Sequence, residues 1–417
     1  TLLCPQMAPI HFDILKEAFR SCGYRIDVMP ALDKSSIETG LKYVNNDACY
    51  PALITAGQVI NALKSGKYDL NKVAILMTQT GGGCRATNYI GFFRKALKNM
   101  GLEHIPVISV SSSGIEKNPG WNYSLPIANR AMQAFVYGDL FMRVLYRTRP
   151  YERVEGSANA LYEKWNEKVK RDIWEGKNFA KNLNGIVRDF DQLPLNGMKK
   201  PRVGVVGEIL VKFHPTANND IVSLLEREGA EAVVPDLLTF ALYSSYNSVI
   251  KHRYLGLGLG TEMKARAAMA FIQSYQRPMI QALKKSDRFG VPSGIIEMAK
   301  MAEPIVSLCN QTGEGWFLTA EMMELIHNGV HNIICTQPFA CLPNHVVGKG
   351  VIKELRRRNP LANVVAIDYD PGASEVNQLN RIKLMLAAAE RNLDKLEQKK
   401  EQSFEPVARP QSVGASI

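Results

Sequence analysis

Short runs of apolar residues recur along the chain, and most of them end at a polar residue, a glycine or a cysteine. Clear examples are residues 73–77, 107–110, 202–207 and 363–368. Runs of this length between turn residues are typical of buried strands. Helical periodicity follows several of them, and a strand, a glycine turn and a helix form the repeating unit of a parallel sheet. The pattern therefore predicts an α/β protein.

The same order of elements occurs twice, which predicts two doubly wound lobes. Residues 1–147 would form an N-terminal α/β lobe, residues 148–200 a helical connection, and residues 201–386 a C-terminal α/β lobe. A charged helix and a loose tail would follow at residues 387–417. In such sheets ligands bind beyond the carboxyl ends of the strands. The predicted strands end at residue 5 and then cover residues 25–28, 73–77, 107–110, 202–207, 232–235, 332–335 and 363–368.

Composition narrows the class of protein. Hydrophobic residues make up 46% of the chain and charged residues 22%, which are ordinary values for a globular protein. We find no apolar stretch long enough to span a bilayer and no secretory signal, so we expect a cytoplasmic protein without a membrane partner. The chain opens at Thr1 inside an apparent strand, and we expect it to continue upstream.

The net charge of +11 favours an acidic partner. No zinc-finger, RNA-recognition or helix-turn-helix signature is present, so we expect no nucleic-acid binding. Two glycine-rich segments do not change this picture. Residues 256–260 lack the G-x-G-x-x-G spacing and are expected to form a flexible loop. Residues 81–83 lack the Lys-Ser/Thr of a P-loop, so we expect no ATP hydrolysis by this chain itself.

The cysteines carry the candidate chemistry. An odd count of seven, without a secretory signal, argues against a disulfide framework. Cys22 lies at a predicted helix end and is interpreted as a structural or surface thiol. The other six lie at strand ends or turns, where glycine and proline leave backbone amides free to face a metal-bound sulfur. Together they predict a metal site, with zinc as an alternative to iron and sulfide. These six are Cys4, Cys49, Cys84, Cys309, Cys335 and Cys341.

Three segments resemble a known superfamily. They are NNDACYPALITAGQ at residues 45–58, TQTGGGCRATNY at 78–89 and ICTQPFACLPNHVVGKG at 334–350. They are similar to subunits of the 2-hydroxyacyl-CoA dehydratase superfamily. Within it they are closest to the double-cubane cluster proteins and to the dehydratase-like C-terminal part of activase-fused proteins. The likeness covers nearly the whole chain.

The resemblance implies two flavodoxin-like lobes with an iron–sulfur cluster between them. A double-cubane cluster, two bridged 4Fe–4S units, would take all six cysteines named above as ligands, whereas a single 4Fe–4S cluster would take three. An ATP-hydrolysing activase, separate or fused upstream, would deliver low-potential electrons, and a homodimer would match a dimeric activase. The first expectation is therefore an iron–sulfur oxidoreductase that reduces a small substrate.

Two other functions stay open. One is a 2-hydroxyacyl-CoA dehydratase subunit with a single four-iron cluster, and the other is a non-catalytic cluster carrier. Glu208 and His214 follow a predicted strand and are the candidate catalytic residues, as proton donors or pocket residues. Both are also compatible with solvated turn residues, and His345 has the same status.

Overall fold

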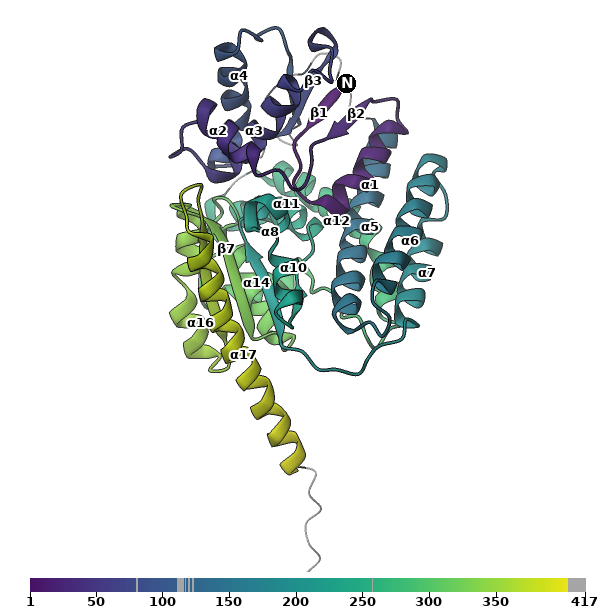
Figure 1. Ribbon diagram of the computed structural model, residues 1–417, viewed down its shortest axis with the longest axis vertical. Coiled ribbons are helices and arrows are strands. Elements are labelled where there is room, and N and C mark those ends of the chain that lie inside the picture. The colour runs from purple at the N-terminus through teal and green to yellow at the C-terminus, as the bar shows by residue number, and fades with distance from the viewer. Residues whose placement is uncertain are drawn as a thin grey trace, which may run out of the picture.

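The computed structural model of the protein describes residues 1–79, 82–110, 116, 118, 121, 124–256 and 258–403, with side chains as far as residue 393. Within these residues the chain forms an α/β structure with two parallel four-stranded sheets (Figure 1). This confirms the predicted fold class. Gly81 of the predicted glycine turn, Leu257 and the predicted tail beyond residue 403 lie outside the described residues.

The first sheet has the strand order β2-β1-β3-β4, and all its neighbouring pairs are parallel. Its strands are β1 (Leu2–Cys4), β2 (Ile26–Val28), β3 (Ala74–Thr78) and β4 (Val107–Val110). Helices α2 (Ser35–Tyr43), α3 (Tyr50–Lys64) and α4 (Tyr89–Asn99) belong to this lobe. Two glycines let α2 and α3 cross closely, because a Cβ on Gly57 would lie 1.7 Å from the carbonyl oxygen of Ser36.

The second sheet has the order β6-β5-β7-β8 and is also parallel. Apolar side chains cover both of its faces, as expected for a parallel sheet. Its strands are β5 (Arg202–Gly207), β6 (Glu231–Val233), β7 (Asn332–Pro338) and β8 (Asn363–Tyr369). The helices of this lobe are α8 (Ile209–Phe213), α9 (Pro215–Asn218), α10 (Ile221–Arg227), α14 (Gly315–His327), α15 (Leu342–Asn344), α16 (Ile352–Arg358) and α17 (Glu375–Ser403).

Beside the sheets, a group of helices shares its own apolar core, on the right of Figure 1. Fully buried Phe141 and Phe190 lie in this core with Trp316, which extends it to the second lobe. The helices are α1 (Pro9–Arg20), α5 (Leu125–Thr148), α6 (Ser157–Glu175), α7 (Phe179–Asp191), α11 (Leu238–Leu255), α12 (Leu259–Leu283) and α13 (Ile295–Ala302).

Buried polar contacts join the two lobes directly. Thr216 of the second lobe accepts a hydrogen bond from the backbone N–H of Asp33 (2.9 Å) and donates one to the carbonyl of Ala31 (2.9 Å). The ring of His214 lies 3.0 Å from the side-chain amide nitrogen of Gln58 on α3. The residues that follow β5 are therefore held against the first lobe.

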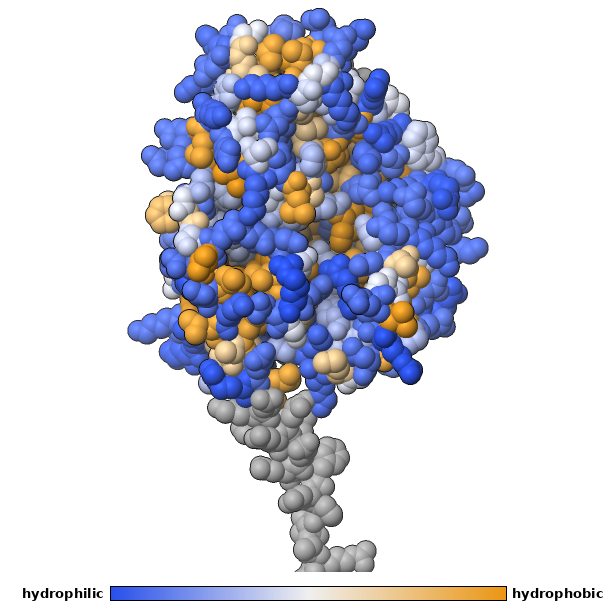
Figure 2. Space-filling model, viewed as in Figure 1, coloured by the Kyte–Doolittle hydropathy of each residue, from blue (hydrophilic) through white to orange (hydrophobic). Residues whose placement is uncertain are grey.

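Each of the eight predicted strands overlaps an observed strand. The predicted flexible loop at residues 256–260 is wrong in part, because α12 begins at Leu259 and Gly256 ends α11 with a φ of +66°. No helix among the described residues is long and apolar enough to cross a membrane. On the face drawn in Figure 2, hydrophilic residues cover most of the surface and apolar residues form separate patches.

Candidate metal centre

Three of the six candidate ligands are residues that directly precede a helix. Cys49 is the N-cap of α3, Cys84 is the N-cap of a 3-10 turn at Arg85–Asn88, and Cys341 is the N-cap of α15. The first N–H groups of a helix have no partner within it, so they favour a negatively charged group there. Backbone amides face all three thiols in this way, although none reaches the geometry of a cap hydrogen bond. These positions suit thiolate ligands.

The Cys49 and Cys84 turns contact each other. The Tyr89 hydroxyl, at the start of α4, lies 3.0 Å from the Cys49 sulfur. Arg85, which follows Cys84, donates hydrogen bonds to the carbonyls of Asp47 and Ala48. Two turns that are 35 residues apart in the sequence therefore form one surface at the carboxyl edge of the first sheet.

The loop at residues 309–313 joins this surface to the second lobe. A Cβ on Gly83 would lie 3.5 Å from the hydroxyl oxygen of Thr312, so the Cys84 turn touches this loop. A Cβ on Gly313 would lie 3.2 Å from the ring of Pro343, two residues after Cys341. The turns of Cys84 and Cys341 therefore lie on either side of one short loop, between the two sheets.

Two carboxyl groups complete this region. Glu208, the N-cap of α8, accepts a hydrogen bond from the backbone N–H of Val211 (2.8 Å). Glu314 accepts one from the N–H of Ile209 (3.1 Å) and one from the side-chain amide of Asn344 (2.8 Å), and the same amide nitrogen lies 3.3 Å from the Cys341 sulfur. Backbone and amide groups thus hold both carboxyls next to the cysteine turns.

The electrostatics of these groups are coupled. Burial, and then the charge of Glu314, raise the pKa of Glu208 to about 8. Burial also raises the pKa of Glu314. Burial is the main cause of the raised pKa values of Cys49, Cys84 and Cys341, and the Glu208 carboxylate contributes to all three. A negative charge here is unfavourable without a compensating cation, so the site favours either protons or a metal.

A buried ion pair lies behind the carboxyls. The Lys212 ammonium group is 2.8 Å from a carboxylate oxygen of Glu321, and both side chains are almost fully buried. The positive charge of Lys212 acts on Glu208, Glu314 and Glu321, lowering their pKa values against the effect of burial. One lysine therefore faces three carboxyl groups.

The remaining three predicted ligands lie in different surroundings. Cys335 is fully buried within β7, and a Cβ on Gly348 would lie 3.0 Å from its sulfur, so it packs as a core residue. Cys4 ends β1 and packs with apolar residues of the sheet face opposite Cys49, and also against a cluster that contains Leu237 and contacts Ile209, next to Glu208. Cys309 is exposed, although its loop contacts the Cys84 and Cys341 turns.

The two candidate histidines have different surroundings. His214 is fully buried, its Nδ1 accepts a hydrogen bond from the N–H of Thr216 (3.1 Å), and burial lowers its pKa to about 4. It is therefore neutral near pH 7 and contacts the first lobe through Gln58. His345 Nδ1 lies 2.8 Å from the carbonyl oxygen of Cys341, so its ring is fixed against that turn.

Cys49, Cys84 and Cys341 lie on separate turns. Among the described residues, no three His, Cys, Asp or Glu side chains are grouped closely enough to bind one metal ion. In a four-iron cluster each thiolate binds a different iron, so the sulfurs lie apart around a larger body. The Cys49 and Cys84 turns contact each other, and the Cys84 and Cys341 turns both contact the loop at residues 309–313.

Sequence reasoning missed Glu314, Asn344 and the Lys212–Glu321 pair. Glu314 stands between Gly313 and Gly315, both with positive φ, and a Cβ on Gly315 would lie 2.2 Å from the carbonyl oxygen of Asn310. A carboxylate between two glycines, directly before an apolar helix, is the signal in the sequence by which Glu314 could have been found. Lys212 and Glu321 are 109 residues apart and left no such signal.

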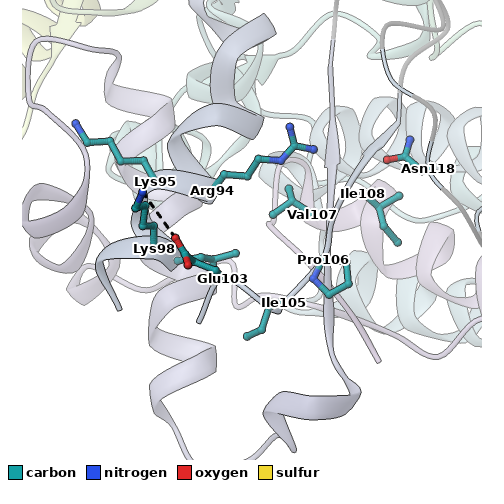
Figure 3. A pocket seen from close by; sticks show the side chains of 10 residues that line it. Arg94, Lys95, Lys98, Glu103, Ile105, Pro106, Val107, Ile108 and Asn118 are labelled. Atoms are coloured by element: carbon teal, nitrogen blue, oxygen red, sulfur yellow. Dashed lines mark ion pairs between the residues drawn. The ribbon is translucent and has the colours of Figure 1, made fainter. Parts of the chain in front are cut away.

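One pocket of the first lobe does not involve these groups. It has a volume of about 620 Å³ and lies between α4 and β4, with Lys98 and Glu103 forming an ion pair (4.0 Å) at its side (Figure 3). No cysteine lines it.

No protein-family model matches the chain, and no curated protein matches it either.

Proposed function

We propose that the chain is the iron–sulfur component of a cytoplasmic, low-potential reductase. It accepts electrons from an ATP-hydrolysing activase and passes them to a small substrate bound between two flavodoxin-like lobes. One observation carries this proposal: Cys49, Cys84 and Cys341 are N-cap residues on turns that converge at the carboxyl edges of two parallel sheets. The resemblance of these same three segments to the dehydratase superfamily supports it.

These three thiols would hold one four-iron cluster and leave one iron without a cysteine ligand. When bound, the cluster would supply the strongly reducing electron. A double-cubane form would also need Cys4, Cys309 and Cys335, and of these Cys309 lies on the loop that contacts the Cys84 and Cys341 turns. The three-thiol site is therefore common to both forms of the cluster.

The chain's own residues would hold protons for the substrate. Burial and mutual repulsion keep a proton on the Glu208–Glu314 pair near pH 7, because the pKa of Glu208 is raised to about 8. Backbone amides fix both carboxyls, and Asn344 connects Glu314 to Cys341. Reduction of a substrate consumes protons as well as electrons, and the pair would supply a proton at the site.

A second candidate is the 2-hydroxyacyl-CoA dehydratase subunit. The observation in its favour is that three cysteines directly precede helices in this region, which is the number that the resemblance implies for a single four-iron cluster. Turnover of a 2-hydroxyacyl thioester with release of water, in the presence of an activase, would establish this function instead.

The test is the iron and acid-labile sulfide content after purification without oxygen. We expect iron to be bound by the wild type, lost in Cys84→Ser and retained in the matched control Cys22→Ser, whose sulfur contacts Arg130 far from the site. About four irons per chain would indicate the three-thiol cluster and about eight the double cubane. Zinc, or no metal, would overturn the proposal.

A further inference from the structure

The hairpin between α11 and α12 carries an apolar surface that no described residue covers. Large side chains are 46–69% exposed on both sides of the junction at Gly256 and Gly258. Leu259 and Met263 are four residues apart on α12, so they lie on one face of that helix. We call this surface the hairpin patch; it consists of Tyr254, Leu255, Leu259 and Met263.

Cations surround the hairpin patch. Lys251 and Lys264 are exposed, and neither has a carboxylate within ion-pair distance among the described residues. Arg253 is exposed as well. The carboxylates nearby are already engaged: Glu262 pairs with Arg266 (2.6 Å), and Glu303 accepts a hydrogen bond from Tyr254 (3.1 Å). The patch is therefore apolar at its centre and positive at its edge.

The hairpin patch lies next to the loop that carries Cys309. The Tyr254 hydroxyl donates a hydrogen bond to Glu303 (3.1 Å), which ends α13 six residues before Cys309. Further along α11, the Tyr243 hydroxyl donates to the carbonyls of Gln311 (3.3 Å) and Gly313 (2.9 Å). The helix that presents the patch thus also supports the loop between the Cys84 and Cys341 turns.

We propose that the hairpin patch is where the electron-donating protein docks, and that this partner presents an apolar centre with an acidic rim. This inference rests on the proposed function. A second copy of this chain fits less well, because two patches with the same positive rim would repel each other. An electron donor also needs to approach the cluster, and Cys309 is the exposed thiol at this edge of the site.

The test compares reduction by a protein with reduction by a small molecule. Leu259→Asp/Met263→Asp changes two exposed side chains (62% and 64%), so the fold should be retained. Leu384→Asp, on α17 and 73% exposed, is the matched control. The probes are a purified ATP-hydrolysing activase of the dehydratase superfamily and titanium(III) citrate, with cluster reduction followed by absorbance.

We expect the double variant to be reduced by the activase at least about tenfold more slowly, in keeping with the loss of two central apolar contacts. Its reduction by titanium(III) citrate and its iron content should match the wild type, and Leu384→Asp should behave as the wild type in both assays. Lys251→Glu/Lys264→Glu should also be reduced slowly by the activase, and the rate with wild type should fall as salt is added.

Other results would overturn the inference in distinguishable ways. If the activase reduces both patch variants at the wild-type rate, the hairpin patch is not the docking site, and the proposed function is unaffected. If titanium(III) citrate reduces the wild type but no activase does, then neither an activase partner nor a docking site for it is supported. Binding to phosphatidylglycerol vesicles that is lost in Leu259→Asp/Met263→Asp, without an effect on activase reduction, would reassign the patch to a membrane surface.

Discussion

The two lobes share one strand order but carry different chemical groups at matching positions. In both sheets the order is second, first, third and fourth strand. After the third strand comes Cys84 in the first lobe and Cys341 in the second, each at the start of a short helical turn. The helix before the third strand begins at Cys49 in the first lobe and at Glu314 in the second.

The first strand of each sheet shows the same difference between a thiol in the first lobe and a carboxyl group in the second. β1 ends at Cys4, whereas Glu208 directly follows β5. The first lobe thus has thiols at all three matching positions, and the second has one thiol and two carboxyls. Cys309 and Cys335 fall outside this correspondence. The repeated architecture thus carries thiols at these positions in the first lobe and mainly carboxyl groups in the second.

The largest expected effect separates two cysteines of the second lobe. Cys341 matches Cys84, whereas Cys335 is a buried strand residue. We expect Cys341→Ser to lose most of its iron, because it removes one of the three proposed ligands. Cys335→Ala should keep its iron and lose only about 1 kcal/mol of unfolding free energy, since it deletes one small buried group. Iron content and urea unfolding measure the two effects.

The opposite result would change the comparison. Loss of iron from Cys335→Ala, with nearly normal urea unfolding, would place Cys335 among the ligands and support the double cubane. Such a result would mean that the end of β7 rearranges when the cluster binds, because Cys335 now packs against Gly348.

The strands were predictable from the sequence because parallel strands covered on both faces read as short apolar runs. Residues 202–207 and 107–110 match β5 and β4 at both ends. The helices between β6 and β7 were not predicted. In α14 buried residues surround much of the helix, as the run from Gly315 to Met322 shows, so it lacks the one-sided pattern by which a helix is recognised.

The candidate site was predictable only where a reactive side chain lies beside residues, such as glycine and proline, that mark a turn. Cysteines beside glycine and proline pointed to Cys49, Cys84 and Cys341. The same rule also selected Cys335, and nothing in the local sequence shows that its sulfur lies against Gly348. Contacts of that kind join residues that are distant in the sequence, and they decide which thiols can meet.

The next largest expected effect concerns the buried carboxyl groups of the second lobe. Lys212→Met would leave Glu321 buried without its partner 2.8 Å away, next to Glu208 and Glu314. We expect a loss of about 3 to 5 kcal/mol in unfolding free energy, the usual cost of breaking a buried pair. Lys212→Met/Glu321→Leu should recover most of it, as measured by urea unfolding. An unchanged stability of the single variant would show that Glu321 is neutral and that Lys212 is not its required counter-ion.

The smallest expected effect tests the contact between the lobes through His214. Burial lowers its pKa to about 4, so the folded state binds the proton more weakly than the unfolded state does. Stability from this group is therefore present above about pH 6.5 and is lost as the pH falls towards 4. The loss between pH 7 and pH 5 amounts to about 2 kcal/mol of unfolding free energy.

His214→Asn keeps an acceptor for the Thr216 N–H but cannot titrate, so its unfolding free energy should depend less on pH in this window. Exposed His104, replaced by Asn, is the matched control and should behave as the wild type. An equal pH dependence of wild type and His214→Asn would show that protonation does not weaken the His214–Gln58 contact, and the lobes would then be held together by Thr216 and its partners.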